Sequence, residues 1–169
     1  MKIKAIDTYY KGYKFRSRLE ARWAVYFDSI GLEWEYEKEG YEFDDGTKYL
    51  PDFWLPEVKM WAEVKPIKLN EKEEKKIFNL VNHTGYPVLE LIGVPEIKTY
   101  NCWKIYKGTA WNCDEVLLSI AYNKFFKNER RFYSMPGEPE ETWEFNFPDI
   151  SRAVNKARSA RFEFGENGE

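Results

Sequence analysis

Two neighbouring segments decide the fold of this chain: Tyr49-Leu50-Pro51-Asp52-Phe53-Trp54-Leu55-Pro56 and Met60-Trp61-Ala62-Glu63-Val64-Lys65-Pro66. The second segment alternates as a strand does, which places Met60, Ala62 and Val64 on one face and Trp61, Glu63 and Lys65 on the other. The prolines bracket the first segment, so it cannot be a regular interior strand throughout. We expect adjacent strands that bring Asp52 next to the Glu63 and Lys65 side chains.

A helix is predicted before these strands. Ser17 and Glu20 have the spacing of a capping box, and apolar residues recur at helical spacing until Gly31. We expect the helix to span residues 17–30.

A second helix is predicted after the strands. Asn70 and Glu73 resemble another capping box, and the apolar pattern continues until Gly85. The apolar run at residues 88–92 is typical of a short buried strand.

Further strands are predicted between the first helix and Lys65. Aromatic and charged residues alternate at residues 33–37 and 40–43, and a turn signal follows at Asp45-Gly46. The predicted order is helix, three strands, helix, strand. This pattern indicates an α/β fold with a mixed central sheet flanked by helices.

The chain after Gly93 carries weaker signals. We expect a strand at residues 103–107, a helix from Asp114 to Phe126, an acidic loop at 128–148 and a final helix at 151–161. The expected organisation is a core at residues 1–93 and a C-terminal helical extension at 94–169, packed on the same domain.

Composition excludes several classes of protein. The chain has 169 residues, of which 43% are hydrophobic and 18% aromatic, as expected of one globular domain with ring-rich packing. Two cysteines and one histidine provide neither a zinc-finger pattern nor a disulfide framework. No apolar run is long enough to cross a bilayer, so we expect no membrane partner and a cytoplasmic location.

Charge is unevenly distributed, although the net charge is only −3. Between Met1 and Arg22 seven cations face two acids, whereas the stretch from Asp28 to Asp45 is strongly acidic. Such polarity can steer a polyanion to one side, although a basic run is more often a solvated face.

Asp52, Glu63 and Lys65 are the candidate catalytic residues. Phosphodiester hydrolysis needs a cation to polarise the phosphate and a group to position water, and carboxylates are ligands that Mg²⁺ prefers. Glu-x-Lys also occurs at Glu57, Glu73, Glu74 and Glu96. Only Glu63-Val64-Lys65 combines strand alternation with an upstream Pro-Asp at a suitable separation.

These motifs together resemble the PD-(D/E)XK nuclease superfamily, particularly small phage-encoded endonuclease-like proteins. The resemblance covers roughly Tyr13 to Gly93. It is carried by Arg16-Ser17-Arg18-Leu19-Glu20-Ala21-Arg22-Trp23-Ala24, by Asp45-Gly46, and by the two segments quoted first.

The resemblance implies a restriction-endonuclease-like αβββαβ core and a magnesium-dependent deoxyribonuclease that leaves 5′-phosphate and 3′-hydroxyl ends. It implies that Asp52 and Glu63 bind Mg²⁺, for which Mn²⁺ can substitute. Lys65 would orient or activate the water, and Glu20 would be a fourth catalytic residue that assists the metal site. Glu20 also has a purely structural explanation, since a capping box requires it.

DNA is the expected partner. Arg16, Arg18 and Arg22 lie at the start of the first helix and could contact phosphates near the cut site, as could Arg158 and Arg161 along the flank. Each set could instead be an exposed basic face. A homodimer is one possible assembly, which the sequence leaves open.

Two functions are consistent with the sequence. The first is a metal-dependent DNA endonuclease. The alternative is a noncatalytic DNA-binding or assembly module that retains the nuclease fold. Residues of the right type at Asp52, Glu63 and Lys65 favour the enzyme.

Overall fold

The computed structural model describes residues 8–114 and 147–162, and in these segments it has an α/β architecture. Its main sheet is mixed and has six strands in the order β10-β9-β8-β7-β6-β3. The bounds of these strands are β3 Glu35–Tyr36, β6 Phe53–Leu55, β7 Met60–Lys65, β8 Val88–Ile92, β9 Asn101–Tyr106 and β10 Thr109–Asp114. Two small hairpins stand apart from it, β1 (Thr8–Tyr10) with β2 (Tyr13–Phe15) and β4 (Tyr41–Glu42) with β5 (Lys48–Tyr49).

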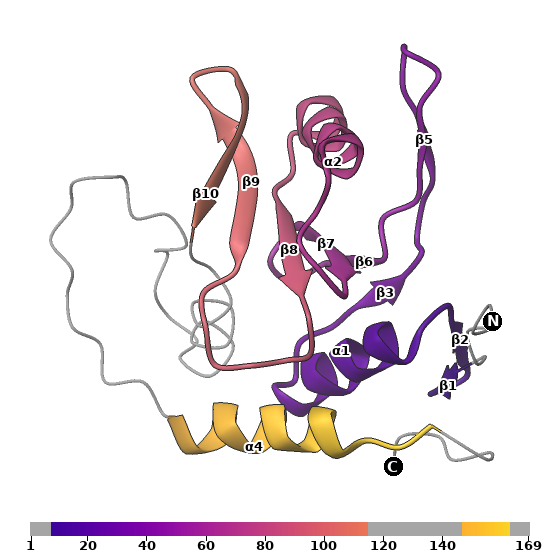
Figure 1. Ribbon diagram of the computed structural model, residues 1–169, viewed down its shortest axis with the longest axis vertical. Coiled ribbons are helices and arrows are strands. Elements are labelled where there is room, and N and C mark those ends of the chain that lie inside the picture. The colour runs from indigo at the N-terminus through magenta and orange to yellow at the C-terminus, as the bar shows by residue number, and fades with distance from the viewer. Residues whose placement is uncertain (1–7, 115–146, 163–169) are drawn as a thin grey trace, which may run out of the picture.

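The three described helices cover the two faces of this sheet. Helix α1 (Arg18–Ser29) and helix α4 (Phe147–Ser159) pack together on one side, and helix α2 (Glu71–Thr84) lies on the other beside the β4–β5 hairpin (Figure 1). Strand β7 sits near the middle, antiparallel to β6 and parallel to β8, with α2 as the crossover between β7 and β8. A parallel pair requires such a crossover.

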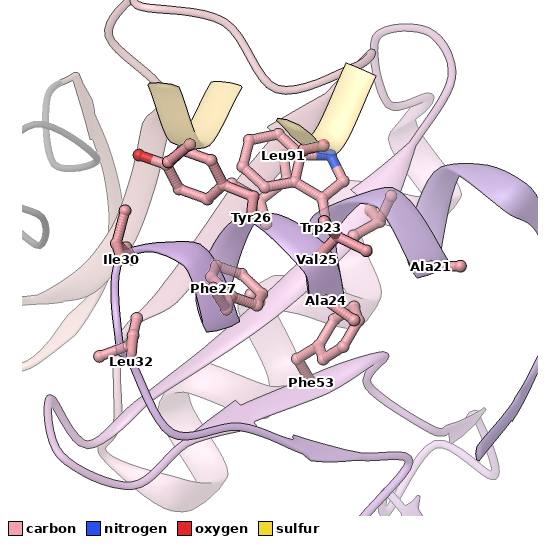
Figure 2. Packing of buried hydrophobic residues seen from close by; sticks show 14 of the residues in the cluster. Ala21, Trp23, Ala24, Val25, Tyr26, Phe27, Ile30, Leu32, Phe53 and Leu91 are labelled. Carbon is pink, nitrogen blue, oxygen red and sulfur yellow. The ribbon is translucent and has the colours of Figure 1, made fainter. Parts of the chain in front are cut away.

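The core between the sheet and helices α1 and α4 is rich in aromatic rings. Trp23, Tyr26 and Phe27 of α1 are completely buried and belong to one hydrophobic cluster with Phe53 of β6 and Leu91 of β8, in which the Phe27 ring contacts that of Phe53 (Figure 2). The indole N–H of Trp23 also donates a 2.9 Å hydrogen bond to the Gly93 carbonyl, because a buried donor needs a partner. This core fixes α1, and with it Glu20, relative to the sheet.

A second core lies under α2. Ile77, Leu80 and Val81 of the helix pack with Trp61 of β7 and Val88 of β8. The residues of β7 therefore divide as the alternation predicts: Met60, Ala62 and Val64 face α1, and Trp61 faces α2. Glu63 and Lys65 share the side of Trp61.

Capping residues mark the starts of α1 and α2, as the sequence predicted. Ser17 caps α1 by accepting from the Glu20 N–H, and Asn70 with Glu73 forms a complete capping box at α2. Gly85 ends α2 in the left-handed conformation. The predicted helices at 17–30 and from Asn70 to Gly85 are confirmed.

The C-terminal half differs from expectation. The predicted strand at 103–107 is one arm of a hairpin, β9–β10, whose second arm was not predicted. Asp114 is the last residue of β10 and not the start of a helix; the remainder of that predicted helix, and most of the predicted loop at 128–148, lie outside the described residues. The final helix begins at Phe147, four residues before the expected Ser151. Because β9 pairs with β8, the main sheet continues across Gly93, where the core was expected to end.

Among the helices that the structure describes, none combines the length and apolar character needed to cross a lipid bilayer.

Candidate active site

Three buried acidic residues lie in a row across β8, β7 and the residue that precedes β6. Glu63 on β7 is directly opposite Glu90 on β8, and continuing the β6–β7 register by one residue places Asp52 opposite Glu63 on the other side. Their exposed fractions are only 5% for Asp52, 6% for Glu63 and 3% for Glu90. Residues opposite one another on neighbouring strands share a face, so all three carboxylates belong to the α2 side of the sheet.

The Asp52 carboxylate is held by the backbone of β7. Its Oδ2 accepts a 2.8 Å hydrogen bond from the Val64 N–H. Burial, followed by the negative charges of Glu63 and Glu20, raises the pKa of Asp52 well above its ordinary value, and the Val64 N–H and Lys65 only partly oppose this. A positive charge beside Asp52 would therefore be strongly favoured.

Glu63 is held from two directions. Its Oε1 forms a 2.8 Å ion pair with Lys65 Nζ, and its Oε2 accepts a 2.7 Å hydrogen bond from the Tyr49 hydroxyl. Desolvation lowers the pKa of Lys65, but the charge and hydrogen bond of Glu63 outweigh it, so the pKa lies above its ordinary value. Lys65 is consequently an ammonium at neutral pH.

Glu20 approaches Asp52 from the other layer of the molecule. Its Oε1 accepts from the Ser17 hydroxyl at 2.7 Å and its Oε2 accepts from the Tyr36 hydroxyl at 2.5 Å. Burial and then the hydrogen bond to Glu20 raise the pKa of Tyr36 far above its ordinary value, so this phenol stays a donor. The carboxylate of Glu20 thus contributes charge to Asp52 while its own oxygens are engaged locally.

A cleft of about 570 Å³ opens above Asp52, Glu63 and Lys65. One wall is the β4–β5 hairpin and the other is the first half of α2, including Lys76 and Ile77. A 2.8 Å ion pair between Asp45 and Lys75 connects the hairpin to α2. Figure 1 shows the hairpin and α2 rising side by side from the same side of the sheet, away from α1 and α4.

The predicted DNA-contacting arginines do not gather at this cleft. Arg16 lines it, and Arg16 is ion-paired with Glu37. Neither Arg18 nor Arg22 is among the residues that line the cleft. Arg158 on α4 pairs with Glu96 at 3.2 Å. Arg161 follows α4 in the chain, and α4 lies on the opposite side of the sheet from α2 (Figure 1).

Lys76 is a cation of this cleft that the sequence did not single out. It lies half-buried on the α2 wall. Within residues 8–114 and 147–162 it has no ion pair, in contrast to Lys65 with Glu63 and Lys48 with Glu42. Its ammonium is therefore available to an anion that enters the cleft.

The donor set fits a divalent cation held by Asp52 and Glu63. Hard oxygen ligands suit Mg²⁺, which commonly uses one or two carboxylates and retains water. In the described part of the chain, no three acidic, histidine or cysteine side chains are arranged to hold one ion together. The structure therefore does not bring Glu20 into one ligand set with Asp52 and Glu63, as the sequence had led us to expect.

Sequence reasoning missed Tyr49, Tyr36 and Glu90. Both tyrosines had been assigned to strands without any chemistry, since nothing local shows which hydroxyl will reach a carboxylate. Glu90 did carry a signal, as the one charged residue in Val88-Leu89-Glu90-Leu91-Ile92. It accepts hydrogen bonds from Trp103 and Asn101.

No protein-family model matches this sequence. A search among curated proteins also found no match.

Proposed function

We propose that this protein is a metal-dependent DNA endonuclease of the PD-(D/E)XK type. In the proposed reaction a water oxygen bonds to phosphorus and the bond from phosphorus to the 3′ oxygen breaks. The 3′ oxygen takes up a proton, which leaves 3′-hydroxyl and 5′-phosphate ends. The observation that carries the proposal is the convergence of Asp52, Glu63 and Lys65 on one face of the sheet, at the floor of one cleft.

Electrostatics supports a metal-binding role for the carboxylates. Burying two carboxylates side by side costs free energy, and one lysine compensates for only part of it. Bound Mg²⁺ would supply Lewis-acid polarisation of the phosphate and would lower the pKa of a water molecule. In this proposal the ligands are Asp52 and Glu63, and the charge of Glu20 adds to the negative potential at Asp52.

Lys65 has the role of a fixed cation. Its ammonium is held beside the carboxylates by the 2.8 Å ion pair with Glu63. There it would orient the attacking water and balance the negative charge that develops on the phosphate. Lys76, on the α2 wall, would contact a neighbouring phosphate of the same strand.

Cleavage assays test this proposal. Linear, supercoiled and four-way-junction DNA would be incubated with Mg²⁺ or Mn²⁺ and the wild type, Asp52→Asn or Lys65→Ala. We expect either substitution to lower the rate by about two orders of magnitude or more. Wild-type products should carry 5′-phosphates, which ligation to a 3′-hydroxyl end would detect.

The chain offers a matched control in Lys98→Ala. Lys98 pairs with Glu96 at 3.0 Å, so it repeats the Glu-x-Lys ion pair of Glu63 and Lys65 outside the cleft. Its removal should leave the cleavage rate unchanged. Equal cutting by wild type and Lys65→Ala would reject the mechanism. DNA binding without cleavage by the wild type would favour the alternative, a noncatalytic binding or assembly module.

A further inference from the structure

Tyr49 reaches Glu63 from outside the main sheet. It lies on β5, in the hairpin that pairs only with β4, and its hydroxyl donates a 2.7 Å hydrogen bond to Glu63 Oε2. The residue is only 7% exposed. A side chain from one wall of the cleft thus touches a carboxylate on its floor.

The Tyr49 hydroxyl and the Lys65 ammonium each bind a different oxygen of the Glu63 carboxylate. Lys65 binds Oε1 and Tyr49 binds Oε2, so the plane of the carboxylate is set by two groups on different elements. Burial, followed by the charge of Glu63, raises the pKa of Tyr49 well above its ordinary value. The Tyr49 hydroxyl therefore remains a hydrogen-bond donor to the Glu63 carboxylate, the group that would bind the cation.

We propose that Tyr49 is a positioning residue that orients Glu63 for binding a divalent cation. This inference rests on the proposed function, in which Glu63 is a ligand. Hydrogen bonds to metal-binding carboxylates typically contribute 10–100-fold to metal affinity or activity. The β4–β5 hairpin is then part of the metal site as well as a wall of the cleft.

A second tyrosine provides a control with the same chemistry. Tyr10 donates a 2.7 Å hydrogen bond to Asp28, which is also ion-paired with Lys11 at 2.9 Å. Tyr10 is 6% exposed and lies on β1, outside the cleft. Both Tyr10→Phe and Tyr49→Phe remove one buried hydroxyl from a carboxylate that keeps its lysine.

The test is calorimetric titration of the full chain with Mg²⁺ in the absence of DNA. Tyr49→Phe should weaken Mg²⁺ binding by about 10–100-fold, and Tyr10→Phe should not change it. In cleavage assays Tyr49→Phe should need a correspondingly higher Mg²⁺ concentration for half-maximal rate, and saturating Mg²⁺ should restore much of that rate. If Tyr49 had only a structural role, its substitution would not change the Mg²⁺ concentration needed for half-maximal rate.

If Tyr49→Phe does not fold, NMR of the unsubstituted chain tests the same inference. With tyrosine labelled at Cζ by ¹³C, Mg²⁺ should shift the Tyr49 resonance and leave that of Tyr10 in place. The inference is overturned if folded Tyr49→Phe binds Mg²⁺ with unchanged affinity. It is also overturned if the Tyr49 resonance does not shift when Mg²⁺ is added. Neither result affects the proposed function, which stands or falls on cleavage by the wild type and its loss in Asp52→Asn.

Discussion

Glu63 and Glu90 lie directly opposite each other on the parallel strands β7 and β8, and both are buried. Each has donors of its own. Glu63 is bound by Tyr49 and Lys65 in the cleft, whereas Glu90 accepts from the side chains of Trp103 and Asn101 on β9. Glu90 is thus bound by neutral donors of the sheet, and Glu63 faces the cleft.

This difference predicts opposite outcomes for two equivalent substitutions. Glu63→Gln should weaken Mg²⁺ binding by more than the 10–100-fold typical of losing a hydrogen bond to a ligand, because it removes the negative charge of the ligand itself. Glu90→Gln should leave Mg²⁺ affinity unchanged and lower the free energy of unfolding by about 1–3 kcal/mol, since one of its donors loses an acceptor. Calorimetry with Mg²⁺ and urea unfolding would measure both. Loss of Mg²⁺ binding in Glu90→Gln would show that the two residues act together.

Asp52→Asn should stabilise the metal-free protein near neutral pH. Because the pKa of Asp52 is raised on folding, the native state holds the proton to higher pH than the unfolded state does. The free energy of unfolding therefore falls as pH rises from the ordinary pKa of 3.8 through the raised pKa. Asparagine avoids this loss, so the variant should be the more stable of the two at neutral pH.

Thermal unfolding in EDTA at pH 7 and at pH 3.5 would measure the effect. Each kcal/mol corresponds to roughly 2–4 °C in a chain of this size. The gain of Asp52→Asn should be present at pH 7 and should be largely lost at pH 3.5, where Asp52 is mostly protonated in both states. A variant less stable than the wild type at pH 7 would contradict the argument.

Lys76→Ala should remove one phosphate contact from DNA binding. The logarithm of the DNA-binding constant falls linearly with the logarithm of the salt concentration. In Lys76→Ala this slope should be less steep by about 0.9 for duplex DNA, or by about 0.7 for a single strand. Binding would be measured in EDTA, where metal-dependent cleavage does not occur. Lys72→Ala is the matched control, because Lys72 is an exposed lysine of the same helix that does not line the cleft. An equal change in both variants would reject a specific role for Lys76.

The two arginines near the C-terminal end of the described chain should behave differently from Lys76. Arg158 is ion-paired with Glu96, and α4 packs on α1, on the far side of the sheet from the cleft. The double substitution Arg158→Ala and Arg161→Ala should therefore leave the salt dependence of DNA binding unchanged. A less steep salt dependence of DNA affinity in the double variant would instead support the prediction that these residues contact the flank of the duplex.

The sequence predicted those parts of the molecule that depend on local rules. The alternation of Met60 to Lys65 correctly assigned the two faces of β7, and the capping residues Ser17 and Asn70 correctly marked two helix starts. Pro51 and Pro56 correctly indicated a broken strand, since β5 ends at Tyr49 and β6 begins at Phe53.

Features that depend on distant contacts were not predictable in this way. The hydrogen bond from Tyr49 to Glu63 joins two separate sheets, and the donors of Glu90 come from a hairpin whose second strand was not foreseen. Arg16 was expected to bind DNA beside Arg18 and Arg22, but only Arg16 lines the cleft. Periodicity assigns a residue to a face, but it does not specify which residue of another element will meet it.

The β4–β5 hairpin leaves and rejoins the main sheet without interrupting it, because β3 pairs directly with β6. Residues Asp44 to Thr47 at its tip could therefore be lengthened or replaced with little strain on the strands that carry Asp52 and Glu63. Such grafts offer a way to redesign which nucleic acids enter, while Tyr49 at the base keeps its bond to Glu63.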